Sequence, residues 1–314
     1  MGTGPFAVPS FDAVRESSHE VIAVVTKPER EVKSRKGPPS APVRRWADEH
    51  GLPLLDPISV NDPVAIEQLR QLQADLFVVC DYGHILKPDA LKASRLGGIN
   101  LHGSLLPAYR GAAPVQRALL SGDRKTGISV ILMTPKLDGG PILATRQTEI
   151  FDTETAGELE SRLSLLGVEP VMECLHLLAT WDGDTALGQP QDPAAATKAP
   201  RLSKREAEID WTGSNREIDC HVRGMQPWPI AFGQLPIKES RPPVRLMVLS
   251  VASSDQNVDD LEPGQIAGGK DLVVASGDGA LKIERLRPAG KREMTGEEFM
   301  RGHQLPRGLR FLEA

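Results

Sequence analysis

Short apolar runs alternate with amphipathic stretches through the first half of the chain. The runs are rich in Val and Ile and contain few polar residues, which is typical of strands buried on both faces. They cover residues 20–26, 74–81, 97–102 and 127–133. Helical patterns lie between them, at residues 41–49, 63–72, 87–94 and 114–120. Strands that alternate with helices predict an α/β domain with a Rossmann-like, mostly parallel sheet.

The second half of the chain follows a different pattern. Residues 154–180 predict one long helix that closes the first domain, and residues 181–200 lose the apolar periodicity, which indicates a linker. A helical pattern at residues 215–223 then precedes short strand patterns at residues 245–251, 271–275 and 280–286. Short strands joined by tight turns over about 100 residues favour a small β-barrel.

Charge restricts how this chain could bind a nucleic acid. The 314 residues include 37 basic and 42 acidic ones, for a net charge of −5, so contact with a polyanion requires local basic patches. Residues 27–45 carry seven Lys and Arg against two Glu, in a Pro- and Gly-rich stretch suited to phosphate groups or to a solvated loop. Residues 282–310 carry eight basic residues against four acidic ones. Two basic surfaces could hold one extended polyanion.

The cysteines and the N-terminal sequence point to the cytoplasm. Cys80, Cys174 and Cys220 are too few and too far apart for a disulfide framework or a Cys-x-x-Cys metal site. The first residues lack the basic and apolar parts of a secretory signal. The longest apolar runs have five residues, so we expect no membrane span.

The densest cluster of reactive residue types lies at the end of the strand pattern at residues 97–102. Asn100 and His102 are two residues apart, so an extended backbone places both side chains on the same face. At the carboxyl end of a parallel strand this face opens into the crevice where α/β sheets bind ligands. Asp138 follows the strand pattern at residues 127–133, and it would lie beside His102 if the two strands were neighbours.

An amide, an imidazole and a carboxylate together suit acyl transfer to an amine. The Asn amide can donate to a developing oxyanion, and the imidazole can exchange a proton near neutral pH. The carboxylate would orient the imidazole. An α-amino group has a pKa of about 7.7 to 8.0, so it can attack directly without a nucleophile from the protein. The alternative is that His102 only satisfies a backbone group at the strand end.

Two further motifs have competing interpretations. Ser104 lacks the Gly-x-Ser-x-Gly elbow of a hydrolase nucleophile, and we interpret it as a turn residue or a ligand contact. Residues 2–7 fit the Gly-x-Gly-x-x-Ala pattern of a dinucleotide loop, but no strand precedes them and no acidic residue follows the pattern at residues 20–26. We therefore interpret these glycines as a tight backbone turn.

The stretch GGINLHGSLLPAYRGAAPVQRALLSGD resembles the core signature of the folate-dependent formyltransferases, and LDGGPIL resembles the segment that carries their aspartate. LSKREAEIDW and VRGMQPWPIAF are similar to the branch of this family that formylates methionyl-tRNA. The resemblance spans essentially the whole chain. It implies a formyltransferase catalytic domain at residues 1–180, a linker at residues 181–204 and an OB-like tRNA-binding domain at residues 205–314.

The same resemblance implies a reaction and a set of residues. The formyl group of 10-formyltetrahydrofolate would move to the α-amino group of methionyl initiator tRNA, on a monomer and without a metal. Asn100, His102 and Asp138 match the family's catalytic triplet. The implied folate contacts are Ser104, Leu105, Leu106 and Pro107 in a turn, and Tyr82, Gly83 and Ile85 in the pteridine pocket. The implied tRNA contacts in the basic loop are Lys33, Arg35 and Lys36.

The sequence departs from the family pattern in two places. The family's basic run is replaced by residues 33–37, and we assign the role of its arginine to Arg35. The family also begins with an apolar strand ahead of the Gly-Thr turn, whereas this sequence begins at the turn. We therefore expect the first strand to be missing and the true start to lie upstream of Met1.

Other functions remain open from the sequence. A nucleotide-sugar formyltransferase shares the catalytic motifs, but its substrate has no acceptor stem that requires several phosphate contacts from a basic loop. An NAD-dependent oxidoreductase and an inactive RNA-binding module are alternatives from other classes of protein.

Overall fold

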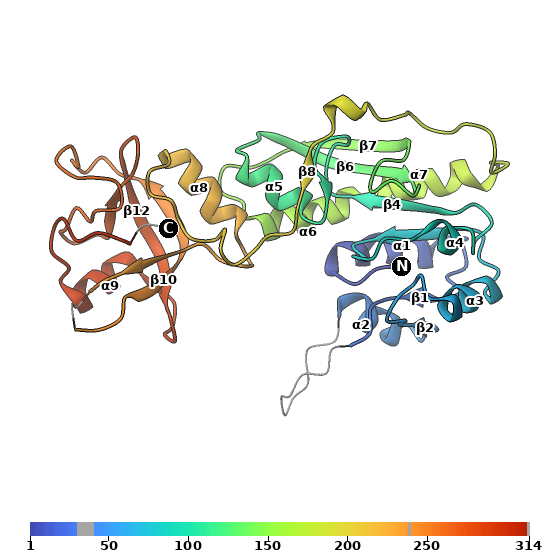
Figure 1. The fold of residues 1–314 in the computed structure, drawn as a ribbon, viewed down its shortest axis with the longest axis horizontal. Helices are drawn as coiled ribbons and strands as arrows, with labels where there is room; N and C mark the ends of the chain where they lie inside the picture. The colour runs from blue at the N-terminus through green and yellow to red at the C-terminus, as the bar shows by residue number, and fades with distance from the viewer. Residues whose placement is uncertain (30–40, 238–239, 313–314) are drawn as a thin grey trace. The chain divides into compact units, whose positions relative to one another are not determined.

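The computed structural model describes residues 1–29, 41–237 and 240–312. The chain divides into two compact units, which Figure 1 traces by colour along the sequence. The first unit comprises residues 1–115, 125–149 and 159–200, and the second comprises residues 116–124, 150–158 and 201–314. The second unit thus takes two short segments from the first half of the sequence.

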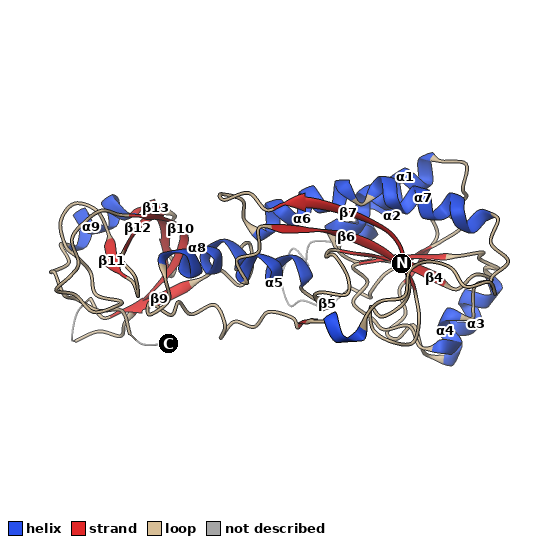
Figure 2. Ribbon diagram, turned by 90° about the horizontal axis from the view of Figure 1, so that it is seen from above, coloured by secondary structure: helices blue, strands red, loops and turns tan. Residues whose placement is uncertain are grey.

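The main sheet of the first unit has the strand order β3-β4-β6-β7, and Figure 2 labels β4, β6 and β7. β3 (Phe77–Cys80) and β4 (Gly98–His102) pair in parallel, as the apolar pattern predicts. β6 (Lys125–Leu132) and β7 (Ile142–Glu149) are antiparallel to their neighbours, so they depart from the parallel arrangement that the alternating pattern predicts for most of the sheet. β7 was not predicted because it is an edge strand in which exposed residues alternate with half-buried ones.

The strand pattern at residues 20–26 forms only two paired residues. β1 (Val24–Val25) pairs in parallel with β2 (Leu54–Leu55), in a sheet of their own. Residues 20–23 belong to no strand. A cavity of about 120 Å³ lies beside them, and residues 20–25 and 76–78 line it.

Met1 and Gly2 form hydrogen bonds with the two strands beside this cavity, β3 and β1. The α-amino group of Met1 donates to the Val78 carbonyl at 2.7 Å, and the Met1 carbonyl accepts from the Cys80 amide at 3.0 Å. The Gly2 amide donates to the Val25 carbonyl at 3.0 Å. Successive residues thus bond to β3 and then to β1, which is the pattern of a central parallel strand. Burial lowers the pKa of the Met1 amino group to about 5.

Most helices of the first unit lie close to their predicted positions. The helices that begin at Pro42, Pro63 and Pro88 each have proline at the first position, where its fixed φ suits a helix. Asp62 caps the helix that begins at Pro63 by accepting from the Val64 amide at 2.9 Å. α1 and α7 lie on one side of the sheet, and α3 and α4 lie on the other (Figure 2). The elements are η1 (Pro5–Ala7), α1 (Val8–Glu16), α2 (Pro42–Glu49), α3 (Pro63–Gln71), α4 (Pro88–Leu91), most of α6 (Ala156–Leu166) and α7 (Val168–Ala179). Most of α5 (Pro114–Leu120) and the first residues of α6 belong to the second unit.

The single helix predicted at residues 154–180 is divided at Gly167 into α6 and α7, because Pro170 in the first turn of α7 has no N–H to donate to the carbonyl of Leu166. A Cβ on Gly167 would lie 2.6 Å from Cδ2 of Leu101 in β4. A side chain at this position would have to displace the Leu101 side chain. η1 and α1 were not predicted, since the glycines at the start of the chain favoured a turn. Gly4 does approach its neighbour closely, because a Cβ there would lie 1.7 Å from an Asp81 carboxylate oxygen.

The second unit is built on an antiparallel sheet of order β11-β12-β10-β9, with β13 paired to β12. The predicted helix and strands at residues 215–286 are confirmed, whereas β9, β13 and α9 were not predicted. Capping boxes begin both helices, at Ser214 with Glu217 and at Thr295 with Glu298. The elements are α8 (Asn215–Gly224), β9 (Phe232–Leu235), β10 (Val244–Ser253), β11 (Val273–Ala275), β12 (Ala280–Pro288), β13 (Met294–Thr295) and α9 (Gly296–His303).

Part of the segment predicted as a linker belongs to the first unit. It contains η2 (Pro193–Ala195) and β8 (Lys198–Ala199), and β8 pairs in parallel with β5 (Arg110–Gly111). In the described part of the chain, no helix combines the length and the apolar character needed to cross a bilayer.

Candidate active site

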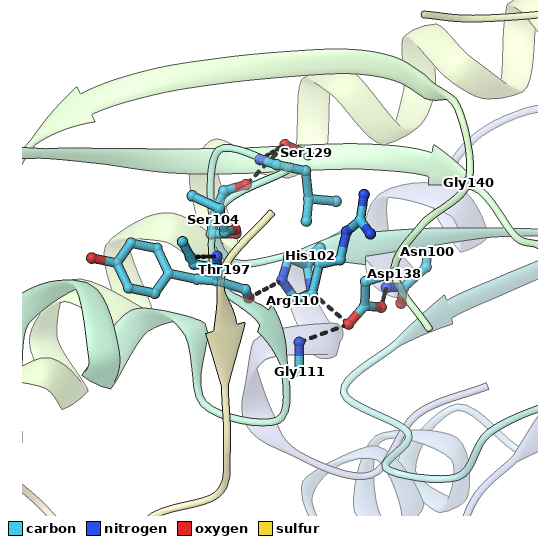
Figure 3. A network of polar contacts seen from close by, with 12 residues as sticks. Asn100, His102, Ser104, Arg110, Gly111, Ser129, Asp138, Gly140 and Thr197 are labelled. Atoms are coloured by element: carbon cyan, nitrogen blue, oxygen red, sulfur yellow. Dashed lines mark hydrogen bonds and ion pairs between the residues drawn. The ribbon is translucent and has the colours of Figure 1, made fainter. Parts of the chain in front are cut away.

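Asn100, His102 and Asp138 meet beside β4 (Figure 3). The amide nitrogen of Asn100 donates to Oδ1 of Asp138 at 3.4 Å, and Nδ1 of His102 lies 3.8 Å from Oδ2 of Asp138. The His102 and Asp138 side chains are only 6% and 12% exposed, so their interaction is weakly screened by water. The structure therefore brings together the three residues that the sequence analysis singled out.

Asp138 reaches this place by a different route from the one the sequence suggested. Because β6 is antiparallel to β4, the carboxyl end of β6 lies beside the start of β4, with Leu132 opposite Ile99. The loop between β6 and β7 must then fold back along β4. At Asp138 the backbone has φ of +47°, a left-handed conformation that costs free energy in any residue except glycine. The Gly111 amide donates to Oδ2 of Asp138 at 2.9 Å and holds the carboxylate.

The imidazole of His102 lies between two oxygen acceptors. Nε2 is 2.9 Å from the carbonyl oxygen of Tyr109, and Nδ1 faces the Asp138 carboxylate. A carbonyl oxygen only accepts, so Nε2 carries a proton in this arrangement. A ring protonated on both nitrogens would have an acceptor beside each one. The site can therefore hold the imidazole in a fixed orientation before and after it takes up a proton.

The turn after β4 is held by internal hydrogen bonds. The Ser104 hydroxyl is buried and donates to the Ala108 carbonyl at 2.7 Å, so it is a turn residue in this structure rather than a free nucleophile. Ser129 of β6 donates to the Ser104 carbonyl at 2.8 Å and accepts from the Leu106 amide at 3.0 Å. Leu105 and Pro107 are half-buried and Leu106 is buried.

The segment after β3 contains a buried hydroxyl without a partner. The Tyr82 ring is buried, and no described group hydrogen-bonds its hydroxyl; burial raises its pKa to about 12. Ile85 is 58% exposed, so it leaves apolar surface at the same segment. Gly83 has φ of +65°, and a Cβ there would lie 2.5 Å from Nζ of Lys27. Burial and the Lys27 charge lower the pKa of neighbouring His84.

None of the three predicted tRNA contacts, Lys33, Arg35 and Lys36, falls within the described residues. At the end of the same basic run, Arg44 donates to Asp56 at 2.5 Å and to the Lys27 carbonyl at 3.2 Å.

The second basic segment is largely neutralised within its own unit. Five of its eight basic side chains pair with acidic side chains, which weakens the expectation of a second basic surface. These are Lys282, Arg285, Arg292, Arg307 and Arg310.

Sequence reasoning missed Gln191, which contacts the main chain at Asp138 and Gly140. Its amide donates to the carbonyls of both residues. Gln191 lies in the segment predicted as a linker, where neither periodicity nor a motif distinguishes it. Within the described residues, no three His, Cys, Asp or Glu side chains are grouped so as to hold a metal ion.

Family models match both halves of the chain. The model described as formyl transferase matches residues 1–175, and the model described as formyl transferase, C-terminal domain, matches residues 201–304. The chain is 57% identical to the methionyl-tRNA formyltransferase of Rhodopirellula baltica, over 99% of this chain and 95% of that one. It is 41% identical to the methionyl-tRNA formyltransferase of Methylococcus capsulatus, over 97% and 96% of the two chains.

Solved structures share the fold at low sequence identity. The N-formyltransferase of Helicobacter canadensis, in complex with folinic acid and dTDP-3-aminofucose, aligns with a TM-score of 0.66 at 14% identity, over 93% of this chain and 97% of that one. HypX from Aquifex aeolicus, in complex with tetrahydrofolic acid, aligns with a TM-score of 0.58 at 14% identity, over 81% of this chain and 43% of that one.

Proposed function

This chain belongs to the methionyl-tRNA formyltransferase family, and from that premise we propose that Asn100, His102 and Asp138 carry out its reaction. The enzyme transfers the formyl group of 10-formyltetrahydrofolate to the α-amino group of methionyl initiator tRNA, and the product serves translation initiation. The single observation that supports these three residues is that all of them meet beside β4, although 38 positions separate Asn100 from Asp138.

Each side chain has a task that its geometry suits. The Asn100 amide donates a hydrogen bond to the formyl oxygen as that oxygen gains negative charge, which lowers the barrier to attack by the amine. His102 takes the proton that the amine loses and passes it to the departing folate nitrogen. Asp138 holds the imidazole in place and faces it with a negative charge. No covalent bond to the protein is required.

The folate co-substrate is placed by two segments of the first unit. The turn at residues 104–107 is held by Ser129, which keeps its backbone in a fixed shape for contact with a ligand. The buried Tyr82 hydroxyl has no hydrogen-bond partner among the described residues, and such groups usually find one in a ligand or water. Residues 82–85 therefore suit a flat heterocycle that combines polar edges with an apolar face.

The second unit is an OB-like tRNA-binding module in this proposal. Its antiparallel sheet and its match to the family's C-terminal domain support that assignment. Lys33, Arg35 and Lys36 supply cations for the phosphates of the acceptor stem, because most of the basic side chains at residues 282–310 are paired with acids. The enzyme acts as a monomer in the cytoplasm, where translation initiation takes place.

An assay with two acceptors tests the proposal. The chain is incubated with 10-formyltetrahydrofolate and either methionyl initiator tRNA or a nucleotide-linked amino sugar, and the formylated products are separated and quantified. Formylation of the tRNA but not of the sugar is expected, with a large loss of turnover in His102→Ala. Turnover that is unchanged in His102→Ala would remove this site from the mechanism, whatever the acceptor.

A further inference from the structure

The side chain of Gln191 uses every polar atom of its amide in contacts around Asp138. Nε2 donates to the Asp138 carbonyl at 2.8 Å and to the Gly140 carbonyl at 2.7 Å. Oε1 accepts from Nε and Nη2 of Arg110, at 3.0 and 2.6 Å. Only one orientation of the amide fits, because carbonyls accept and a guanidinium donates. Gln191 therefore joins the main chain around Asp138 to Arg110.

The segment that carries Gln191 is itself fixed on both sides. Before it, Gln189 and Ile142 exchange two backbone hydrogen bonds of 2.8 Å. After it, Thr197 accepts from the Tyr109 amide through its hydroxyl and from the Arg110 amide through its carbonyl, both at 2.8 Å (Figure 3). The chain on either side of Gln191 is thus fixed by backbone hydrogen bonds. The Gln191 side chain can therefore hold Asp138 and Gly140 in a fixed position.

Arg110 and Gly111 form a closed ring of hydrogen bonds with Gln191 and Asp138. The Gly111 amide holds the carboxylate of Asp138, and the adjacent Arg110 side chain holds Gln191, which in turn holds the Asp138 carbonyl. Gly111 is needed at this position because its φ is +133° and a Cβ would lie 2.5 Å from the Ala199 carbonyl oxygen. One dipeptide therefore fixes both the side chain and the main chain of Asp138.

Asp138 needs this support because its own element does not provide it. It lies in a loop that folds back along β4, and its φ of +47° is unfavourable for a residue with a Cβ. Within the loop, a single backbone turn joins Gly139 to Lys136, at 3.1 Å. Both Gln191 contacts fall on the carbonyls of Asp138 and Gly140, where the loop must hold its shape.

We propose that Gln191 is a positioning residue for catalysis, which sets the backbone of Asp138 and so places its carboxylate against Asn100 and His102. This inference rests on the proposed role of Asp138. It also gives residues 191–199 a function in the active site rather than that of a passive linker. Gln191 does not touch the reacting atoms, so its effect must pass through Asp138.

Substitution of Gln191 by Glu is the sharpest test, made in the full chain. Glu has the same length and can still accept from Arg110, but it cannot donate to the two carbonyls and places a negative charge against them. Misplacement of a catalytic group by about 1 Å costs up to ~10²-fold in rate, so kcat is expected to fall about 10- to 100-fold in Gln191→Glu. KM for both substrates is expected to change by less than about twofold, since Gln191 binds neither substrate directly.

Matched variants separate a positioning role from a structural one. Gln189→Glu introduces the same change two residues away, at an exposed side chain whose position is held by its backbone, and it is expected to retain full turnover. Gln191→Met keeps the length without the hydrogen bonds or the charge, and it is expected to lose turnover as well. A thermal unfolding midpoint within about 2 °C of the parent would exclude loss of the fold as the cause.

A double-mutant cycle with Asp138→Asn decides whether the effect passes through Asp138. If it does, adding Gln191→Glu to Asp138→Asn lowers kcat by less than about twofold more, because the two residues act as a unit. Losses that multiply, a loss confined to KM, or an equal loss in Gln189→Glu would each overturn the inference. Full turnover in Asp138→Asn alone would instead overturn the proposed role of Asp138.

Discussion

Asn100 and His102 stand on a strand in the middle of the sheet, whereas Asp138 stands in a loop at its end. β3 pairs with residues 98–101 of this strand on one side, and β6 pairs with residues 99–102 on the other, each in an unbroken register. The loop residue has no ladder of its own. Its place depends on Gly111 for the carboxylate and on Gln191 for the main chain.

The difference shows that one active site is built by two means. Strand alternation places two side chains on one face at no cost beyond forming the sheet, which the core already stabilises. A loop residue with positive φ needs contacts from elsewhere to hold it. The strand side of the site, Asn100 and His102, should therefore keep its geometry when distant segments are changed. The loop side, Asp138, should not.

The largest expected effect comes from removing the strand-borne groups. Replacing Asn100 or His102 by Ala should lower kcat by about 10²- to 10³-fold, the scale for loss of one group that stabilises the developing charge. Steady-state kinetics with methionyl initiator tRNA measures this. His176→Ala, at an exposed histidine on α7, is the control and should behave like the parent. A loss confined to KM would assign Asn100 or His102 to substrate binding rather than to chemistry.

The second prediction concerns the sheet that supports the strand side. The cavity between residues 20–25 and residues 76–78 has the partners of a further parallel strand, and Met1 already bonds as its last residues would. Fusing about six apolar residues ahead of Met1 should raise stability by about 2–3 kcal/mol, by filling a space of this size. Urea unfolding of the two chains measures the difference, and a fused polar segment of equal length is the control.

The same extension changes how stability depends on pH. The buried Met1 amine has a pKa of about 5, below its ordinary value of 8.0, so the unfolded chain binds more protons between these values. Stability from this group is therefore present above pH 8 and is lost as pH falls toward 5. The extended chain lacks this amine, and its unfolding free energy should fall less over that range. Equal slopes would show that the amine is not buried.

The third prediction concerns the Gly111 amide that holds Asp138 on the loop side of the site. Gly111→Ala places a Cβ against the Ala199 carbonyl at an unfavourable φ, which should cost about 1–3 kcal/mol and move the amide that holds Asp138. A loss of turnover beyond the loss of folded protein is expected, from kinetics and denaturant unfolding on the same preparation. Gly302→Ala is the control, since nothing lies within 4 Å of a Cβ there. Parent-like turnover in Gly111→Ala would mean that Asp138 does not depend on this amide.

The smallest expected effect separates the two basic segments. Removing Arg35 and Lys36 together should weaken tRNA binding and reduce the slope of log K against log salt by about one unit for each phosphate that is no longer neutralised. Replacing Arg285 and Arg292, which pair with Glu293 and Glu298, should change the slope less. Titration of tRNA over a range of salt concentrations measures both. Equal slopes in the two double variants would contradict the assignment of tRNA binding to Arg35 and Lys36.

The sequence by itself determined the features that depend on neighbouring residues. Proline and a capping side chain placed the start of α3, a capping box placed α8, and a two-residue repeat put Asn100 and His102 on one face. The motifs around these residues indicated the family. These are local signals, since each is read within one turn of helix or a few residues of strand.

The tertiary structure decided what depends on partners far along the chain. It made β6 antiparallel to β4, reduced the strand expected at residues 20–26 to the two residues that pair with β2, and brought Gln191 to Asp138 across 53 positions. Strand direction and side-chain contacts of this range are set by which surfaces pack together. No local pattern carries that information, because a polar residue in a stretch without periodicity has the same sequence context whether it points into solvent or holds a catalytic loop.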